Sequence, residues 1–186
     1  AISHGSLMGA RGNSGVILSQ ILRGLVGTLK GATDLTATKV AEALKAASAA
    51  AYQAVLKPIE GTILTVVRES ADAATAAAAE GATLVGMLRA ARAAGKTALD
   101  NTPELLAVLK DAGVVDAGGA GYLLFLDSAL FVVDGVALPE PDEGDGPSAE
   151  QLELVAHRHA TDGGVDVSEL RYEVMYFVDL VDDRIQ

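Results

Sequence analysis

A glycine-rich segment that runs directly into an apolar stretch with helical spacing is the feature that most constrains how this chain can fold. Residues 9–15 place three glycines around Arg11, Asn13 and Ser14, and the apolar positions that follow recur at helical intervals as far as Leu29. Glycine lets a backbone adopt positive φ angles and approach a ligand closely. The pattern predicts a tight loop and then a helix from about Ser14 to Leu29, with Asn13 or Ser14 available to cap it.

The start of such a helix suits an anion. It presents unpaired N–H groups and the positive end of the helix dipole, and Arg11 adds a cation beside them. The segment lacks the Gly-Lys-Ser/Thr ending of phosphate-loop NTPases, and no strand precedes it as in dinucleotide-binding folds. Two interpretations therefore stay open: a phosphate-holding loop, or a glycine-softened helix start that lets two helices pack closely.

The rest of the chain up to residue 136 reads as a series of helices. Pro58 and Gly81 mark the ends of two of them, and Pro103 falls in the first turn of a short one. Half of the residues are hydrophobic but only 4% are aromatic, so the core is predicted to consist of Ala, Leu and Val in closely packed helices. The predicted helices span about residues 14–29, 36–56, 62–79, 83–99, 102–112 and 117–133.

The order of these helices predicts where the special loops meet. If neighbouring helices with short connections run antiparallel, residues 9–15, 58–62 and 116–121 lie at the same end of an all-α up-and-down bundle. Convergence of three glycine-bearing loops favours a ligand site. Simpler roles stay open for two of the residues, because Asp116 and Thr62 both stand where a helix begins.

Charge and composition limit the partners. The formal net charge is −11, which opposes binding to nucleic acid or to an anionic membrane surface. No uninterrupted apolar run reaches the roughly 18 residues of a membrane span. The absence of cysteine excludes disulfides and thiolate chemistry. We therefore expect a soluble, cytoplasmic protein.

Three ordered motifs give the chain a specific resemblance. It resembles the nucleotide-binding domain of fatty acid kinase, which is related to the dihydroxyacetone kinase L subunit and its DhaL-like domain family. The motifs are Gly9-Ala10-Arg11-Gly12-Asn13-Ser14-Gly15-Val16-Ile17-Leu18-Ser19-Gln20, Pro58-Ile59-Glu60-Gly61-Thr62-Ile63-Leu64 and Val115-Asp116-Ala117-Gly118-Gly119-Ala120-Gly121-Tyr122.

The resemblance implies an all-helical antiparallel barrel that holds ATP or ADP at one end. It assigns the first loop to the phosphates, the second to the adenine and ribose, and the third to closing the pocket. The implied nucleotide-binding residues are Gly12, Asn13, Ser14 and Gly15, then Thr62 and Ile63, then Asp116, Gly118 and Gly119.

The implied activity of the whole protein is transfer of the γ-phosphoryl group of ATP to a fatty acid, giving an acyl phosphate. The fatty acid would be presented by a separate acyl-binding, DegV-like protein. One alternative is a dihydroxyacetone-type kinase L subunit, which acts on a small hydroxy-ketone bound to another chain. A second alternative is a non-catalytic helical module that senses nucleotide or is purely structural.

One departure from the family concerns magnesium. The family binds Mg²⁺ through an aspartate-rich segment before the first motif, and residues 1–7 do not contain it. We expect the metal ligands and further N-terminal helices to lie upstream of residue 1, and the present chain to be inactive without them. Loss of those helices would expose a seam of the barrel, which we expect a homodimer to cover.

The composition changes after residue 136. Residues 1–136 are predicted to form the DhaL-like nucleotide-binding domain. Residues 137–168 read as an acidic linker rich in Pro and Gly that contains a short helix. Residues 169–186 read as the first strand of a truncated α/β middle domain.

Overall fold

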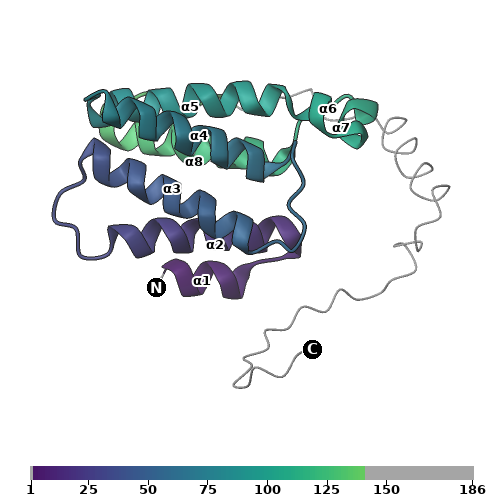
Figure 1. Ribbon diagram of the computed structural model, residues 1–186, viewed down its shortest axis with the longest axis horizontal. Coiled ribbons are helices and arrows are strands. Elements are labelled where there is room, and N and C mark those ends of the chain that lie inside the picture. Colours follow the sequence, from purple (N-terminus) through teal and green to yellow (C-terminus); the bar gives the residue numbers. More distant parts are fainter. Residues whose placement is uncertain (1, 141–186) are drawn as a thin grey trace, which may run out of the picture.

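The computed structural model of the chain describes residues 2–140, which form helices and connecting loops without a strand (Figure 1). The linker helix and the strand expected after residue 140 lie outside the described residues. The helices are α1 (Ile2–Gly9), α2 (Gly12–Leu29), α3 (Ala37–Gln53), α4 (Ile63–Ala79), α5 (Leu84–Asp100), α6 (Thr102–Leu105), α7 (Ala107–Ala112) and α8 (Ala117–Asp134).

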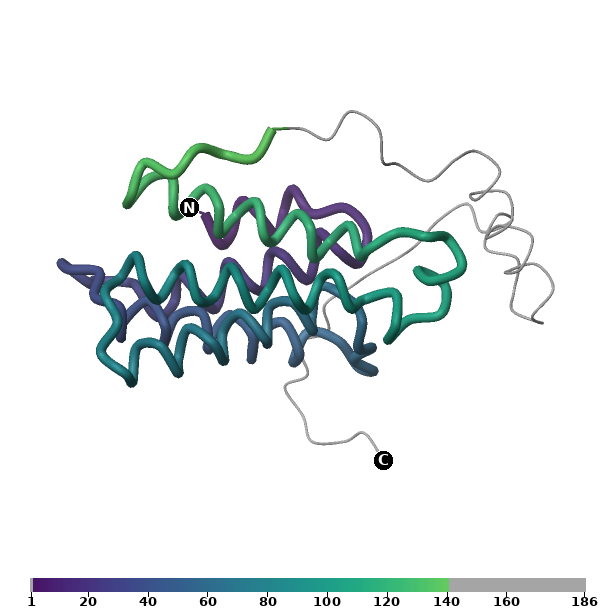
Figure 2. Tube along the Cα trace, turned by 90° about the horizontal axis from the view of Figure 1, so that it is seen from above, coloured from purple at the N-terminus to yellow at the C-terminus, as the bar shows by residue number. Residues whose placement is uncertain are grey.

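The long helices lie side by side along one axis, so their connections fall at two ends of the bundle (Figure 2). Helix α3 packs against α2 on one side and α4 on the other, and α1 packs on α2. Helix α8 lies against both α4 and α5. In Figure 1, α3 therefore joins a layer formed by α1 and α2 to a layer formed by α4, α5 and α8. The predicted all-α fold is confirmed.

Small aliphatic side chains fill the centre of the bundle, as the composition predicts. Alanines of α3, α4 and α5 are completely buried and allow these helices to approach closely. Larger side chains from five helices fill the remaining space, because a core of alanine alone would leave voids. The largest fully buried apolar side chains are Tyr122, Ile21, Leu44, Met87, Leu126, Val66 and Val67.

Three local features differ from the sequence predictions. Residues 2–9 form a helix, α1, that no sequence signal indicated. Helix α2 begins at Gly12, so Asn13 and Ser14 lie inside its first turn, and the prediction that one of them caps the helix is wrong. The predicted short helix at 102–112 is two helices, because Leu106 adopts an extended conformation between them.

Helix α8 is apolar on its outer side as well as on its inner side. It is the one helix within residues 2–140 that is long and apolar enough to span a membrane. Buried core helices of soluble proteins meet the same criterion of length and composition. The inner side of α8 packs in the core through Tyr122, Leu126 and Leu130. Phe131 and Val132 on its outer side are exposed.

Candidate functional site

A cavity of about 610 Å³ lies at the end of the bundle where α2 and α4 begin and α3 ends. All three glycine-bearing loops contribute to it, as the order of the helices predicts. The start of α2 supplies Asn13 and Ser14, and we call this side the α2 wall. The opposite side, which we call the loop wall, consists of the α3–α4 loop with Thr62 and of Asp116 at the start of α8.

The α2 wall presents a helix terminus without a side-chain cap. Arg11 occupies the N-cap position with extended backbone angles, and its side chain makes no capping hydrogen bond. Its guanidinium Nη1 instead donates to the Ala10 carbonyl at 2.8 Å. Gly12 has a φ of +62° and no atom near the place where a Cβ would stand. The first N–H groups of α2 therefore remain available to an anion.

Asn13 and Ser14 are exposed and line the cavity, whereas the two flanking glycines shape the backbone. A Cβ on Gly15 would stand 3.3 Å from the Ala10 Cα, so this glycine allows α2 to pack against the preceding turn. Of the four nucleotide-binding residues predicted in the first motif, the structure thus brings Asn13 and Ser14 to the cavity and leaves Gly12 and Gly15 outside its lining.

Thr62 caps α4 and also lines the cavity. Its Oγ1 accepts a hydrogen bond from the Leu64 N–H at 3.4 Å, and its hydroxyl donates to the Ile59 carbonyl at 2.8 Å. Ile63 is buried in the core and contributes to the cavity floor. Lys57 adds an exposed cationic side chain to the lining of the same cavity.

Behind the cavity, Glu60 ties the α3–α4 loop to both helices that it joins. Its Oε1 accepts from the Tyr52 hydroxyl of α3 at 2.9 Å. Its Oε2 accepts from the Thr65 hydroxyl at 2.7 Å and from Arg68 Nη2 at 3.0 Å, both on α4. The Gly61 N–H donates to Thr65 Oγ1 at 2.8 Å, so the loop backbone joins the same network.

The network shifts the titration of its members. The Thr65 hydroxyl is the main cause that lowers the pKa of Glu60, with Tyr52 and Arg68 adding to it. Burial raises the pKa of Tyr52 despite the opposing hydrogen bond from Arg68. The hydrogen bond to Tyr52 is the main cause that raises the pKa of Arg68. Glu60 is therefore a carboxylate at neutral pH, held by three donors.

Asp116 caps α8, and buried Thr102 fixes its position. The Gly119 N–H donates to Asp116 Oδ2 at 2.7 Å. The Asp116 N–H donates to Thr102 Oγ1 at 3.1 Å, while the Thr102 hydroxyl donates to the Leu99 carbonyl at 2.7 Å. The capping role of Asp116 is thus confirmed, and its contact with nucleotide stays a prediction.

Gly118 and Gly119 lie behind Asp116 and outside the cavity lining. A Cβ on Gly119 would stand 2.8 Å from Val66 Cγ2, so its absence lets α8 pack tightly against α4. A Cβ on Gly118 would meet the Ile63 side chain at 3.3 Å. Both glycines contribute to the site by setting where α8 begins.

No group of three or more His, Cys, Asp or Glu side chains that suits a metal ion occurs within residues 2–140. Asp116 is the one carboxylate among the described residues that line the cavity, and its Oδ2 is already bonded to Gly119. Mg²⁺ prefers several oxygen ligands, including one or two carboxylates. The donors present here do not make up such a site.

Sequence reasoning missed four residues that shape the site. Glu60 stands inside the second motif and Lys57 directly precedes it, so their position in the loop could have been noticed. Arg68 directly precedes Glu69, and nothing in the sequence connects it to the α3–α4 loop. It does pair with Glu69 at 2.8 Å, but it also reaches Tyr52 and Glu60. Nothing in the sequence indicated the role of Thr102.

Comparisons with known proteins give matches over most of the chain. The DAK2 domain matches residues 1–130. An uncharacterized protein of Staphylococcus epidermidis is 40% identical over 170 residues, which cover 91% of this chain and 30% of that protein. Protein YloV of Bacillus subtilis is 37% identical over 183 residues, which cover 96% of this chain and 33% of YloV. The chain thus spans about a third of the length of these curated relatives.

Proposed function

The chain belongs to the DAK2 domain family, and we propose that it is the nucleotide-binding part of a kinase that phosphorylates a fatty acid. The observation that carries the proposal is the cavity in which an uncapped helix terminus, a lysine and two further loops meet. DAK2 domains occur in kinase subunits, which supports nucleotide as the ligand of this cavity.

The cavity brings together several groups that suit an anion, although the chain as a whole is acidic. The N–H groups at the start of α2 and the side chains of Asn13 and Ser14 are suited to bind phosphate oxygens. Lys57 would balance part of the phosphate charge. Thr62 and Ile63, on the opposite wall, offer a hydroxyl and an apolar surface for the ribose and base.

In the proposed reaction, a carboxylate oxygen of the fatty acid attacks the γ-phosphorus of ATP. The bond from that phosphorus to the β,γ-bridging oxygen breaks, and ADP leaves. Positioning and charge stabilisation provide most of the catalysis in such transfers. Among the described lining residues, the Thr62 hydroxyl already donates to the Ile59 carbonyl, so it is not poised to act as a nucleophile. This supports an acceptor carboxylate that arrives on a separate acyl-binding, DegV-like protein.

Magnesium normally bridges the phosphates in this chemistry. The lining carboxylate Asp116 is engaged in a cap, so the described lining residues do not by themselves hold the metal. The same observation favours a second candidate, a module that binds nucleotide without transferring phosphate. Binding and transfer must therefore be measured separately.

Calorimetric titration of ADP and ATP, with and without Mg²⁺, tests the proposal. We expect the chain to bind both nucleotides and Asn13→Ala to weaken binding about tenfold, the effect of losing a charge-assisted hydrogen bond. Asn101→Ala is the matched control, because Asn101 is exposed outside this cavity and makes no capping hydrogen bond. We expect it to leave the affinity unchanged.

Transfer is tested by mixing the full-length protein with ATP, a fatty acid and an acyl-binding protein, and by trapping acyl phosphate with hydroxylamine. Formation of acyl hydroxamate supports the kinase. Nucleotide binding without any product supports the non-catalytic module. Absence of nucleotide binding by the chain and by the full-length protein would overturn both candidates.

A further inference from the structure

The α3–α4 loop separates two cavities. Ile59 and Thr62 face the proposed nucleotide cavity. Glu60, between them in sequence, lines a second cavity of about 560 Å³ together with Thr65 and Arg68. The loop thus presents its ligand-facing residues on one side and is held from the other side.

The hold on the loop comes from both neighbouring helices. Tyr52 at the end of α3 donates to Glu60 and accepts from Arg68 Nε at 3.1 Å. Arg68 and Thr65 on α4 donate to the second oxygen of Glu60. A carboxylate that bridges two helices in this way fixes the loop more firmly than a single cap does, because moving the loop would break several bonds together.

The loop backbone is fixed as well. Gly61 has a φ of +83°, and a Cβ there would stand 2.9 Å from the Leu105 Cβ and 3.1 Å from the Thr102 carbonyl oxygen. Its N–H donates to the same Thr65 hydroxyl that bonds to Glu60. The direction in which Thr62 leaves the loop therefore depends on Glu60 and its partners.

We propose that Glu60, held by Tyr52, Thr65 and Arg68, is a positioning residue that sets Thr62 for nucleotide binding without touching the nucleotide. The inference rests on the proposed nucleotide site. It assigns a role in ligand affinity to a charged group that faces away from the ligand.

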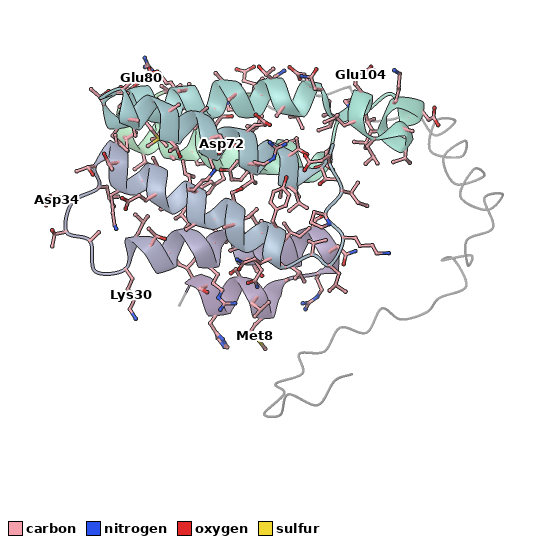
Figure 3. The ribbon with its side chains drawn as sticks, viewed as in Figure 1. Met8, Lys30, Asp34, Asp72, Glu80 and Glu104 are labelled. Atoms are coloured by element: carbon pink, nitrogen blue, oxygen red, sulfur yellow. The ribbon has the colours of Figure 1, made fainter. Side chains whose placement is uncertain are left out.

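The first test is the ADP affinity of Glu60→Gln, measured by calorimetry in the full chain. We expect it to weaken about tenfold, because the amide presents an NH₂ group to donors that need an acceptor. Asp72→Asn is the matched control. It breaks an ion pair with Lys45 that also joins α3 to α4, and its side chain lies mid-bundle between the ends marked by Asp34 and Glu104 (Figure 3). We expect a change of less than about twofold.

Two double variants separate positioning from general loss of structure. In a Thr62→Ala background, Glu60→Gln should weaken ADP binding by less than about threefold further, because the group that it positions is gone. In an Asn13→Ala background, the full effect of about tenfold should remain, because Asn13 lies on the opposite wall. A merely structural role would give the same factor in both backgrounds and overturn the inference.

Tyr52→Phe is a milder second test of the same role, which can be used if Glu60→Gln does not fold. It removes one of the donors to Glu60, and we expect ADP to bind about threefold more weakly. If the parent chain binds ADP and both variants bind it equally well, the positioning role is wrong while the proposed function stands. If neither the parent chain nor the full-length protein binds ADP, the proposed site and this inference both fail.

Discussion

The α2 wall and the loop wall line the same cavity but differ in how many of their polar groups are hydrogen-bonded within the protein. Arg11 at the start of α2 makes no cap, and Asn13 and Ser14 are exposed beside unpaired N–H groups. On the loop wall, Thr62 and Asp116 each cap a helix. The Glu60 side chain bonds the loop to Thr65 of α4, and the Asp116 N–H donates to Thr102.

The difference teaches how a ligand site can divide its tasks. Donors that are satisfied within the protein fix the shape of the loop wall before any ligand arrives, which limits the entropy lost on binding. Donors that are left open on the α2 wall gain their partners only from the ligand or from water. The free energy of binding should therefore depend on the α2 wall directly and on the loop wall through its geometry.

The largest expected difference between the two walls is the loss of stability when a glycine with positive φ is replaced by alanine. Gly61→Ala should lower the free energy of unfolding by about 3 kcal/mol, because a strained φ adds to the close contact with Leu105 and Thr102. Gly12→Ala should cost only about 1 kcal/mol, since its φ is similar but the surrounding space is open. Urea unfolding of both variants measures the difference. Equal losses would mean that the loop wall is no more tightly packed than the α2 wall.

Thr102→Val removes one hydroxyl from behind the loop wall while nearly keeping its shape. We expect the free energy of unfolding to fall by about 2 kcal/mol, because the Asp116 N–H loses its acceptor. Thr97→Val is the control, since the exposed Thr97 hydroxyl only donates to a carbonyl of its own helix. Its effect should be below about 0.5 kcal/mol. A similar loss in both variants would contradict a special role for Thr102.

Tyr122 provides a contrast with Thr102, because both carry a buried hydroxyl but, within residues 2–140, only that of Thr102 makes hydrogen bonds. Removing the Tyr122 hydroxyl tests whether the hydrogen bonds of such a group, and not its mere presence, contribute to stability. The Tyr122 hydroxyl is buried without a hydrogen-bond partner in the described part of the chain. Tyr122→Phe should therefore be neutral or slightly stabilising at pH 7, in contrast to Thr102→Val. A loss of 2 kcal/mol at pH 7 would reveal a partner of the Tyr122 hydroxyl.

The same variant predicts a pH dependence. Burial raises the folded-state pKa of Tyr122 above its ordinary value of 10.0, so the unfolded state loses this proton first as the pH rises. The contribution to stability is complete below pH 10 and declines above it. By pH 11 the parent chain should have lost on the order of 1 kcal/mol of stability relative to Tyr122→Phe. Parallel stability curves for the two proteins between pH 9 and 11 would contradict the shift.

Arg11→Ser should give the start of α2 a side-chain cap like those that Thr62 and Asp116 provide on the loop wall. A serine at the N-cap position should raise the free energy of unfolding by about 1 kcal/mol, and its oxygen should compete with nucleotide for the helix N–H groups. Arg11→Gln removes the charge without adding a good cap. It should leave the free energy of unfolding unchanged and weaken ADP binding less than Arg11→Ser does. If Arg11→Ser binds ADP as tightly as the parent chain, the open terminus of α2 is not the phosphate site.

Much of the helical framework could be predicted from local signals. Apolar spacing located the five long helices, and Pro58, Gly81 and Gly113 marked ends close to those observed. Antiparallel order then placed three loops around one cavity. The helix start at Gly12 was missed, because Asn13 and Ser14 are stronger N-cap residues than Arg11. Leaving that end uncapped is locally unfavourable, which is what a ligand site can require.

The sequence by itself determined where the five long helices lie and which loops share an end, because these depend on spacing within one segment and on short connections. Only the tertiary structure decided the roles of Glu60, Arg68 and Thr102. Arg68 meets a tyrosine 16 positions away, and Thr102 accepts from an N–H 14 positions away. Hydrogen bonds between separate elements depend on how helices pack and where each loop is held, and no local pattern of residues encodes that arrangement.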